Sequence, residues 1–511
     1  MTENQKAGRR EWVGLAVIAL PCLIYSMDLT VLHLAVPQLS ADLRPSSSQL
    51  LWIVDIYGFF VAGFLITMGT LGDRIGRRKL LLIGAVAFAV ASLVAAFSSS
   101  AEMLIAARAL LGIAGATIAP STLSLIRNMF HDPQQRTVAI GIWITAYSAG
   151  GALGPLIGGA MLEFFWWGSV FLLAVPVMAL LLVVGPILLP EYKDPEPGRL
   201  DLLSAAMSLV AVLAVIYGLK QSVQDGLGWL PVVVIAAGLA IGVGFVLRQR
   251  RLDDPLIDLR LFSVPEFSGS LAVYTLGILV LFGAFLFLFQ YLQLVQGLSP
   301  IVAGLWTLPS FASFIVGSML APALVKRVRP AAVMAPGLAI AAVGFAILAF
   351  VDEGSSLGLL VVASVIYSLG LAPIFTLTND LIIGAAPPER AGAASAISET
   401  GAELGGALSI AVLGTIGTAV YRSRMADETP SALEPESAAA AQDTLGGAVA
   451  EAAGLPETLG DELLAAAFAA FSDGMQVAAV LSAVLALLAA VLVGGFLRRL
   501  RAAPAPDPAS A

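Results

Sequence analysis

Long apolar stretches separated by short polar segments dominate the chain. Runs of roughly twenty residues with few charges recur from one end to the other, and a helix of that length crosses the hydrocarbon core of a bilayer. The pattern predicts an all-α, polytopic membrane protein with fourteen transmembrane helices. The predicted spans lie near residues 13–33, 51–71, 80–98, 102–122, 137–163, 168–189, 201–220, 229–248, 268–290, 302–322, 333–351, 357–377, 391–420 and 474–497.

Composition excludes a soluble protein of this length. Of the 511 residues, 59% are hydrophobic and only 12% are charged, and the mean hydropathy is +0.92. A soluble chain would need far more polar surface. The N-terminus, with Lys6, Arg9 and Arg10 before an apolar run, resembles a signal peptide. That run is too long for one, so we expect an uncleaved first span.

The distribution of positive charge predicts the orientation. If both ends lie on one side, 22 of the 27 Lys and Arg residues fall in the segments on that side. Basic segments stay on the cytoplasmic face of a membrane. We therefore expect both termini in the cytoplasm, in a multi-pass protein of the cytoplasmic (plasma) membrane.

Two polar breaks suggest how the helices are grouped. EYKDPEPGRLD (191–201) follows the sixth span and RQRRLDDPLIDLRLF (248–262) follows the eighth. We expect an N-terminal six-helix bundle over 1–190, an inserted helix pair (spans seven and eight) over 191–260, and a C-terminal six-helix bundle over 261–511. Two such bundles, related by a pseudo-two-fold axis, would enclose a substrate cavity.

One long segment falls on the outer side, between spans 13 and 14. Residues 421–470 are rich in Ala and hold nine acidic residues against Arg422 and Arg424. Fifty residues are too many for a simple turn. The Ala content favours a small helical hairpin, and a disordered acidic loop remains an equal alternative.

The loop between spans two and three carries a specific pattern. GTLGDRIGRRKL (69–80) has glycines that permit a tight turn and four basic residues after one acid. Any basic loop would anchor the cytoplasmic face. The sharper interpretation is a cytoplasmic gate in which Asp73 binds a helix N-terminus of the other bundle and Arg74 or Arg77 pairs with acids there. The candidate gate residues are Gly69, Asp73, Arg74, Gly76, Arg77 and Arg78.

The fifth span carries a glycine–proline pattern, GIWITAYSAGGALGPLIGG (141–159). Gly150, Gly154 and Gly158 repeat at every fourth position, which gives a flat stripe for close helix packing. A small-residue stripe alone usually means packing only, whereas the full spacing with a proline is far more specific. The motif residues are Gly141, Gly150, Gly154, Pro155, Gly158 and Gly159.

These motifs, together with DLTVLHLAVP (28–37) and the Arg108–Gly112 spacing of the fourth span, resemble the major facilitator superfamily. The fifth-span pattern is typical of its drug:proton antiporters. LWIVDIY (51–57) and PPERAGAASAISETGAELGGALS (387–409) are similar to the fourteen-helix branch, which includes bacterial quaternary-ammonium and multidrug exporters. His33 departs from that pattern, because Asn is common there.

Charged residues inside the predicted spans are the candidate transport site, because burying a charge in a membrane is costly. By helix rise, Asp28, Asp55 and Arg108 lie roughly 8, 6 and 9 Å from the outer ends of their spans. Arg108 needs a carboxylate partner, and Asp28 is a candidate. Asp55 is near enough to the interface to reach water instead.

Two further carboxylates lie on the thirteenth span. Glu399 and Glu403 are four residues apart, so they share one helix face, roughly 12 and 18 Å from the inner end. Their mutual repulsion and burial favour proton uptake and release in the physiological range. We expect Asp28, Asp55, Glu399 and Glu403 to bind protons and a lipophilic cation in competition. A structural partner for Glu399 remains an alternative.

Several aromatic side chains lie close to these acids in the sequence. They can stack on a cation, although each one is more often a packing or interface residue. Asp380, near the inner end of the twelfth span, is a candidate gate or cap rather than a cation site. The possible aromatic contacts are Tyr25, Trp52, Tyr57, Trp143 and Tyr147.

Other classes of function fit the sequence poorly. Two His, one Cys and no metal-ligand spacing argue against an enzyme and against a metal site. No Lys follows a Gly, so no phosphate-binding loop drives transport with ATP. The resemblance implies a cofactor-free, proton-coupled antiporter of lipophilic cations, working as a monomer in the bilayer without nucleic acid. Export of an endogenous metabolite, antibiotic or lipid remains the alternative.

Overall fold

The computed structural model describes residues 6–43, 45, 47–193, 201–224, 228–252, 255, 257–387 and 391–496. Within these ranges the protein is helical and has no strand. The helices begin and end as their sequences dictate. Asp132 caps α6 (Pro133–Phe164) by accepting a hydrogen bond from the Gln135 amide at 2.8 Å, and Pro133 occupies the first turn, where its missing N–H is not needed.

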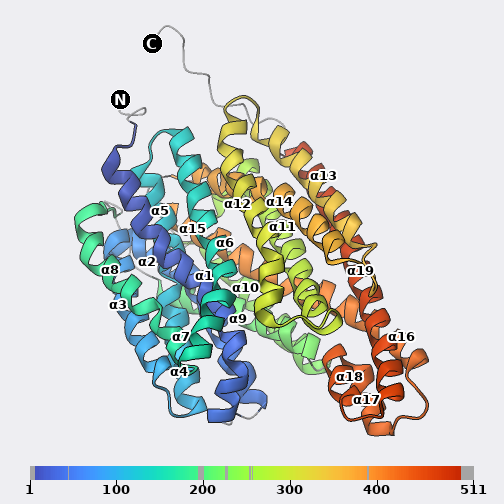
Figure 1. Ribbon diagram of the computed structural model, residues 1–511. Helices are drawn as coiled ribbons and strands as arrows, with labels where there is room; N and C mark the ends of the chain where they lie inside the picture. Colours follow the sequence, from blue (N-terminus) through green and yellow to red (C-terminus); the bar gives the residue numbers. More distant parts are fainter. Residues whose placement is uncertain are drawn as a thin grey trace.

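Helices α1 to α8 form the first bundle, which is blue to cyan-green in Figure 1. Besides α6, its elements are α1 (Arg9–Leu43), α2 (Ser47–Ile75), α3 (Arg77–Ala96), α4 (Ala101–Gly115), α5 (Ile118–Met129), α7 (Ser169–Leu172) and α8 (Ala174–Leu188). The inserted pair consists of α9 (Leu202–Gln224) and α10 (Trp229–Gln249).

The second bundle is yellow to red in Figure 1. The 3₁₀-helix η1 (Leu259–Ser263) leads into it. Its elements are α11 (Pro265–Gln290), the π-turn η2 (Tyr291–Val295), α12 (Pro300–Val325), α13 (Pro330–Leu348), α14 (Leu357–Ala385), α15 (Ala391–Ser409), the π-turn η4 (Ile410–Gly414), α16 (Thr415–Glu428) and α19 (Glu457–Phe496).

The all-α class is confirmed, and each of the fourteen predicted spans has a helical counterpart. Thirteen helices of the described chain are long and apolar enough to cross a membrane. The seventh span corresponds to α9, whose described apolar run, Leu203–Leu219, is shorter. Three spans are not single helices. The fourth divides into α4 and α5, the sixth into α7 and α8, and η4 interrupts the thirteenth.

The long segment between spans 13 and 14 contains two short helices, α17 (Pro435–Asp443) and α18 (Leu445–Ala452). They pack on α16 and α19, where the Tyr421 hydroxyl donates to the Ala441 carbonyl at 2.8 Å. This arrangement favours the helical hairpin over the disordered loop. The hairpin lies at the opposite end of the molecule from the first turn of α1 (Figure 1). We call the end that holds Arg9, Arg77 and Pro133, the first residues of α1, α3 and α6, the basic end.

The bundles meet along two seams. Helix α6 packs on α12 in one seam, and α15 packs on α2 and α5 in the other. Helix α9 lies on the second seam, where Ile216 forms a small apolar cluster with Phe59 and Ala62 of α2 and Ala407 of α15. The contact with α2 is very close. A Cβ atom on Gly63 would lie 2.4 Å from Leu209 Cδ1 of α9.

Candidate functional site

An ion pair joins α1 and α4 inside the first bundle. Arg108 Nη1 lies 2.5 Å from Asp28 Oδ2, and the Arg108 side chain is only 1% exposed. Its Nε donates to the Ile53 carbonyl at 3.1 Å, and its guanidinium lies 4.8 Å from the Tyr57 ring centroid. The expected partner of Arg108 is therefore Asp28. Because the pair is neutral as a unit, the cost of burying either charge is reduced.

Four of the five candidate aromatic residues form a connected cluster beside this pair. Ring centroids lie 5.9 Å apart between Tyr25 and Tyr57, 5.5 Å between Tyr25 and Tyr147, and 4.6 Å between Trp143 and Tyr147. The Trp143 Nε1 donates to Thr122 Oγ1 at 3.0 Å, which fixes the indole. The cluster draws on α1, α2 and α6 and is largely buried.

Trp52 lies apart from this cluster. It is 40% exposed, and its ring stacks on Tyr217 of α9 at 6.3 Å and contacts Phe59 at 6.0 Å. The contact joins the inserted pair to α2, so it supports packing. Asp55 belongs to α2, but its side chain lies outside the described residues. The side chain of His33 also lies outside them.

Glu399 and Glu403 lie one turn apart on α15 and are half-buried. Oε1 of Glu399 is buried, and no group of the described chain donates a hydrogen bond to it. Both carboxyls lie close enough to Tyr25 to act on it electrostatically, and Glu399 also acts on Tyr147. The acids of the second bundle thus lie near the aromatic cluster of the first.

The loop between α2 and α3 folds back on its own bundle. Asp73 near the end of α2 pairs with Arg77, the first residue of α3, and the Arg77 side chain is fully buried. Gly76 has φ 111°, a value that strains any other residue, and it turns the chain between the two helices. The Arg77 amide donates to the Tyr192 carbonyl at 2.8 Å. Arg77 was expected to pair with acids of the other bundle, and the structure pairs it with Asp73 instead.

The remaining basic residues of this loop hold the chain after α8. The Glu191 carboxylate accepts hydrogen bonds from the Arg78 and Lys79 amides, each at 3.1 Å. The Arg78 guanidinium donates to the Leu189 carbonyl at 2.9 Å. Gly69 is buried in α2 and Arg74 is half-buried beside the turn. The motif therefore ties α2, α3 and the end of α8 into one unit.

A polar contact joins the two bundles at the basic end. The sequence predicted one of its residues, Asp380, and not the two that bind it. Asp380 near the end of α14 accepts from Arg136 Nε at 2.8 Å and from Thr137 Oγ1 at 2.9 Å. Asp380 was a candidate gate, whereas Arg136 and Thr137 were missed. The signal available was depth, since all three residues lie near the inner ends of their predicted spans.

The glycines of α6 serve two packing faces. A Cβ on Gly150 would lie 2.2 Å from the Leu23 carbonyl oxygen, and one on Gly158 would lie 3.0 Å from Val31, so this face holds α1. Gly141 and Gly159 face α12, where added Cβ atoms would meet Met319 and Ile301 at 2.9 and 3.3 Å. Gly154 is buried, and the side chain of Pro155 lies outside the described residues. The motif thus serves the intra-bundle contact and one seam.

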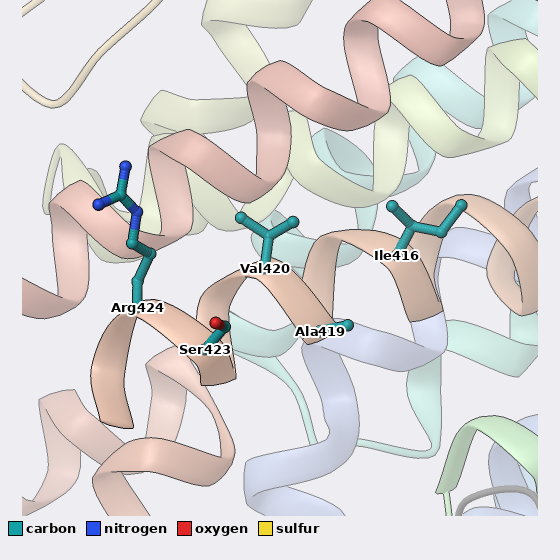
Figure 2. A pocket seen from close by; sticks show the side chains of 5 residues that line it. All are labelled: Ile416, Ala419, Val420, Ser423 and Arg424. Carbon is teal, nitrogen blue, oxygen red and sulfur yellow. The ribbon is translucent and has the colours of Figure 1, made fainter. Parts of the chain in front are cut away.

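An open hollow of about 380 Å³ lies away from this centre, on α16 (Figure 2). Arg424 borders it, and its Nε lies 2.9 Å from Asp473 Oδ2. Because its only cation already has a carboxylate partner, the hollow presents no free charge to a ligand. It is lined by Ile416, Ala419, Val420, Ser423 and Arg424.

Two helical bundles with ionisable groups between them define a multi-pass membrane transporter. Residues 18–410 match the Major Facilitator Superfamily. The chain is 46% identical over 490 residues to the multidrug efflux pump LfrA of Mycolicibacterium smegmatis, covering 96% of this chain and 97% of the relative. It is 37% identical to the methyl viologen resistance protein SmvA of Salmonella typhimurium (94% and 97%) and 32% identical to the tetracenomycin C resistance and export protein of Streptomyces glaucescens (94% and 91%).

The chain belongs to the major facilitator superfamily, which confirms the resemblance drawn from its motifs. Solved structures agree on the fold. The human organic anion transporter MFSD10 matches with a TM-score of 0.62 at 17% identity, covering 94% of this chain and 99% of that one. A bacterial homologue of the human lysosomal transporter Spinster matches with a TM-score of 0.57 at 19% identity, covering 98% and 100%.

Proposed function

We propose that this protein is a proton-coupled antiporter that exports lipophilic, mostly cationic compounds across the cytoplasmic membrane by alternating access. The names of three relatives, which concern multidrug efflux, methyl viologen resistance and tetracenomycin C export, support drug export. The basic end faces the cytoplasm in this proposal, as the distribution of Lys and Arg predicts. The protein works as a monomer and uses the proton gradient without a cofactor.

The observation that carries the proposal is the contrast between two half-buried acids. Asp28 has a cation beside it in Arg108, whereas Glu399 has a buried oxygen without a hydrogen-bond donor in the described chain. An ionised carboxylate cannot remain buried alone at tolerable cost. Partial burial of the Glu399 carboxylate therefore favours uptake of a proton or contact with a cation from outside the protein. Glu399 therefore meets the central requirement of an exchanger, which is that proton and substrate exclude each other.

The surrounding groups suit an organic cation. The cluster of Tyr25, Tyr57, Trp143 and Tyr147 presents aromatic rings across from α15, and such rings attract cations through their π faces. Glu403 lies one turn further along α15 and adds a second negative charge. At the basic end, the Arg136–Asp380 contact joins α6 to α14 across the two bundles, and we assign it the role of a cytoplasmic gate. Its release would open the site toward the cytoplasm.

The test uses purified protein in liposomes with an imposed pH gradient and ethidium as the probe. We expect the wild type to move ethidium, an uncoupler to abolish the movement, and Glu399→Gln to lose it. Glu353→Gln is the matched control, because Glu353 is exposed in the loop between α13 and α14. Gradient-dependent ethidium movement at wild-type rates in Glu399→Gln would remove Glu399 from the coupling.

Export of a dedicated endogenous compound is the second candidate. The relative from Streptomyces glaucescens, named for resistance to and export of tetracenomycin C, favours it. The same liposomes separate the two candidates when cationic dyes are compared with neutral and anionic compounds. A wild type that moves neutral compounds and leaves ethidium in place would favour the dedicated exporter.

A further inference from the structure

A second cavity lies at the basic end, far from the carboxylates of the centre. Its volume is about 490 Å³, within the range of small-molecule sites. Three elements of the first bundle border it, namely the start of α1, the end of α5 and the end of α8. The side chains that matter to the argument are Lys6, Arg10, Glu11, Asn128 and His131.

The polar lining is electropositive. Glu11 is the one acid, and its Oε2 already accepts a hydrogen bond from the Gly8 amide at 2.7 Å. Nη2 of Arg10 donates to the Ile187 carbonyl at 2.8 Å, which holds the guanidinium at the edge of the cavity. The other N–H groups of the guanidinium can still donate to a ligand. Lys6 makes no ion pair within the described part of the chain. Lys6 and Arg10 outnumber Glu11, whose carboxylate already accepts a hydrogen bond. An anion in the cavity could therefore accept hydrogen bonds from Lys6 and Arg10.

The apolar surroundings of the cavity point to the kind of anion. Leu188 and Pro190 line it, and directly above them α8 presents Leu180, Val183 and Ile187, which share one helix face. Val183 is 69% exposed and Ile187 is 66% exposed, on a helix apolar enough to cross a membrane. The basic cavity therefore borders the end of an apolar helix face, since Leu188 lines the cavity and Arg10 bonds the Ile187 carbonyl. Anionic headgroups collect at such juxtamembrane basic residues.

We propose that this cavity binds an anionic phospholipid, with its phosphate on Lys6 and Arg10 and an acyl chain along Val183 and Ile187 of α8. A soluble anion would satisfy the basic residues and leave the apolar face unused. A zwitterionic lipid would use that face and bring its own cation to the basic residues. The bound lipid would join α1, α5 and α8, whose ends border the cavity.

The test measures lipid binding to the full-length protein by native mass spectrometry in mild detergent, with thermal stability as a second readout. The probes are phosphatidylglycerol, phosphatidylcholine and inorganic phosphate. We expect phosphatidylglycerol to bind and stabilise the wild type, and the variant Lys6→Gln, Arg10→Gln to bind it roughly 25-fold more weakly. The matched control is Arg9→Gln, Lys79→Gln, which removes two charges from exposed residues of the same end that do not line the cavity.

Each result decides the proposal. Equal loss of phosphatidylglycerol binding in the two double variants would overturn the proposal in favour of a general effect of charge. Wild-type binding in both double variants would also overturn it. Binding of phosphatidylcholine as strong as that of phosphatidylglycerol would overturn recognition of the headgroup. Stabilisation by inorganic phosphate alone would reassign the cavity to a soluble anion. Lys6→Gln alone keeps the Arg10–Ile187 contact, so a weakened affinity in this variant supports the proposal even if the double variant folds poorly.

Discussion

Replacement of Asp28 by Asn separates the role of a paired acid from that of an unpaired one. The substitution keeps the size of the side chain and removes its charge, and so takes away the carboxylate that pairs with the buried Arg108 guanidinium. Arg108 keeps its hydrogen bond to Ile53 and its place beside the Tyr57 ring. The Asn oxygen still offers one acceptor.

Those contacts set the size of the effect. Removal of one partner from a buried ion pair costs about 3–5 kcal/mol of folding free energy. Because three interactions of Arg108 persist in some form, we expect a loss near the lower end, about 3 kcal/mol. The double variant Asp28→Asn, Arg108→Gln removes the stranded charge and should recover about 2 kcal/mol of this loss. Glu399→Gln leaves no stranded charge, so it should change stability by no more than about 1 kcal/mol.

The assay is reversible unfolding in mixed micelles, combined with ethidium transport by the same preparations. We expect Asp28→Asn to be destabilised and Glu399→Gln to be stable but inactive. If Asp28→Asn were as stable as the wild type, or if the double variant were less stable than the single one, the Asp28–Arg108 pair would not hold α1 to α4. A stable, fully active Asp28→Asn would also remove Asp28 from the transport path.

Three further predictions concern packing and gating. Gly150→Ala places a methyl group on the Leu23 carbonyl and should cost about 2 kcal/mol or more in the same unfolding assay, since backbone cannot move aside cheaply. A wild-type unfolding curve would refute the close approach of α1 and α6. Asp380→Asn weakens the contact with Arg136, so spin labels on the basic ends of α6 and α14 should move apart in pulsed EPR distances; unchanged distances would mean that other contacts close this end. Trp52→Ala should leave ethidium transport within about twofold of the wild type, because its ring packs on α9, and a total loss would place it in the path.

The sequence predicted those features of the fold that depend only on the order of apolar and polar residues along the chain. Each apolar run became a helix because a bilayer leaves a spanning backbone few other ways to satisfy its hydrogen bonds. The break inside the fourth span escaped prediction, because α4 and α5 belong to one apolar stretch, Ala101–Met129, and the turn between them is local. There the Thr117 hydroxyl donates to the Ala114 carbonyl at 2.7 Å, an interaction that hydropathy does not record.

The sequence predicted how deep each candidate residue lies in the membrane. It did not predict which face of its helix each residue occupies. Asp28 and Arg108 were predicted to lie at similar depths in the membrane. Because a buried Arg is costly without a carboxylate partner, their pairing could be anticipated. Trp52 lies on the same span as Tyr57, yet it faces α9, because a helix turns about 100° per residue and the neighbours of each face are set by tertiary packing. For the same reason, sequence reasoning did not pair Arg136 with Asp380 or single out Glu399 as the acid without a donor.

The position of α9 decides which parts of the protein can move as rigid bodies. On one side, the Leu209 and Leu213 side chains of α9 pack directly on Gly63 of α2, and Trp52 stacks on Tyr217. On the other side, its apolar contact with α15 rests on the small side chain of Ala407. We expect sliding to be easier across the second surface, since interdigitated side chains resist shear. We therefore expect the inserted pair to move with the first bundle. Alternating access would then rock eight spans against six, two bodies of unequal mass around one site.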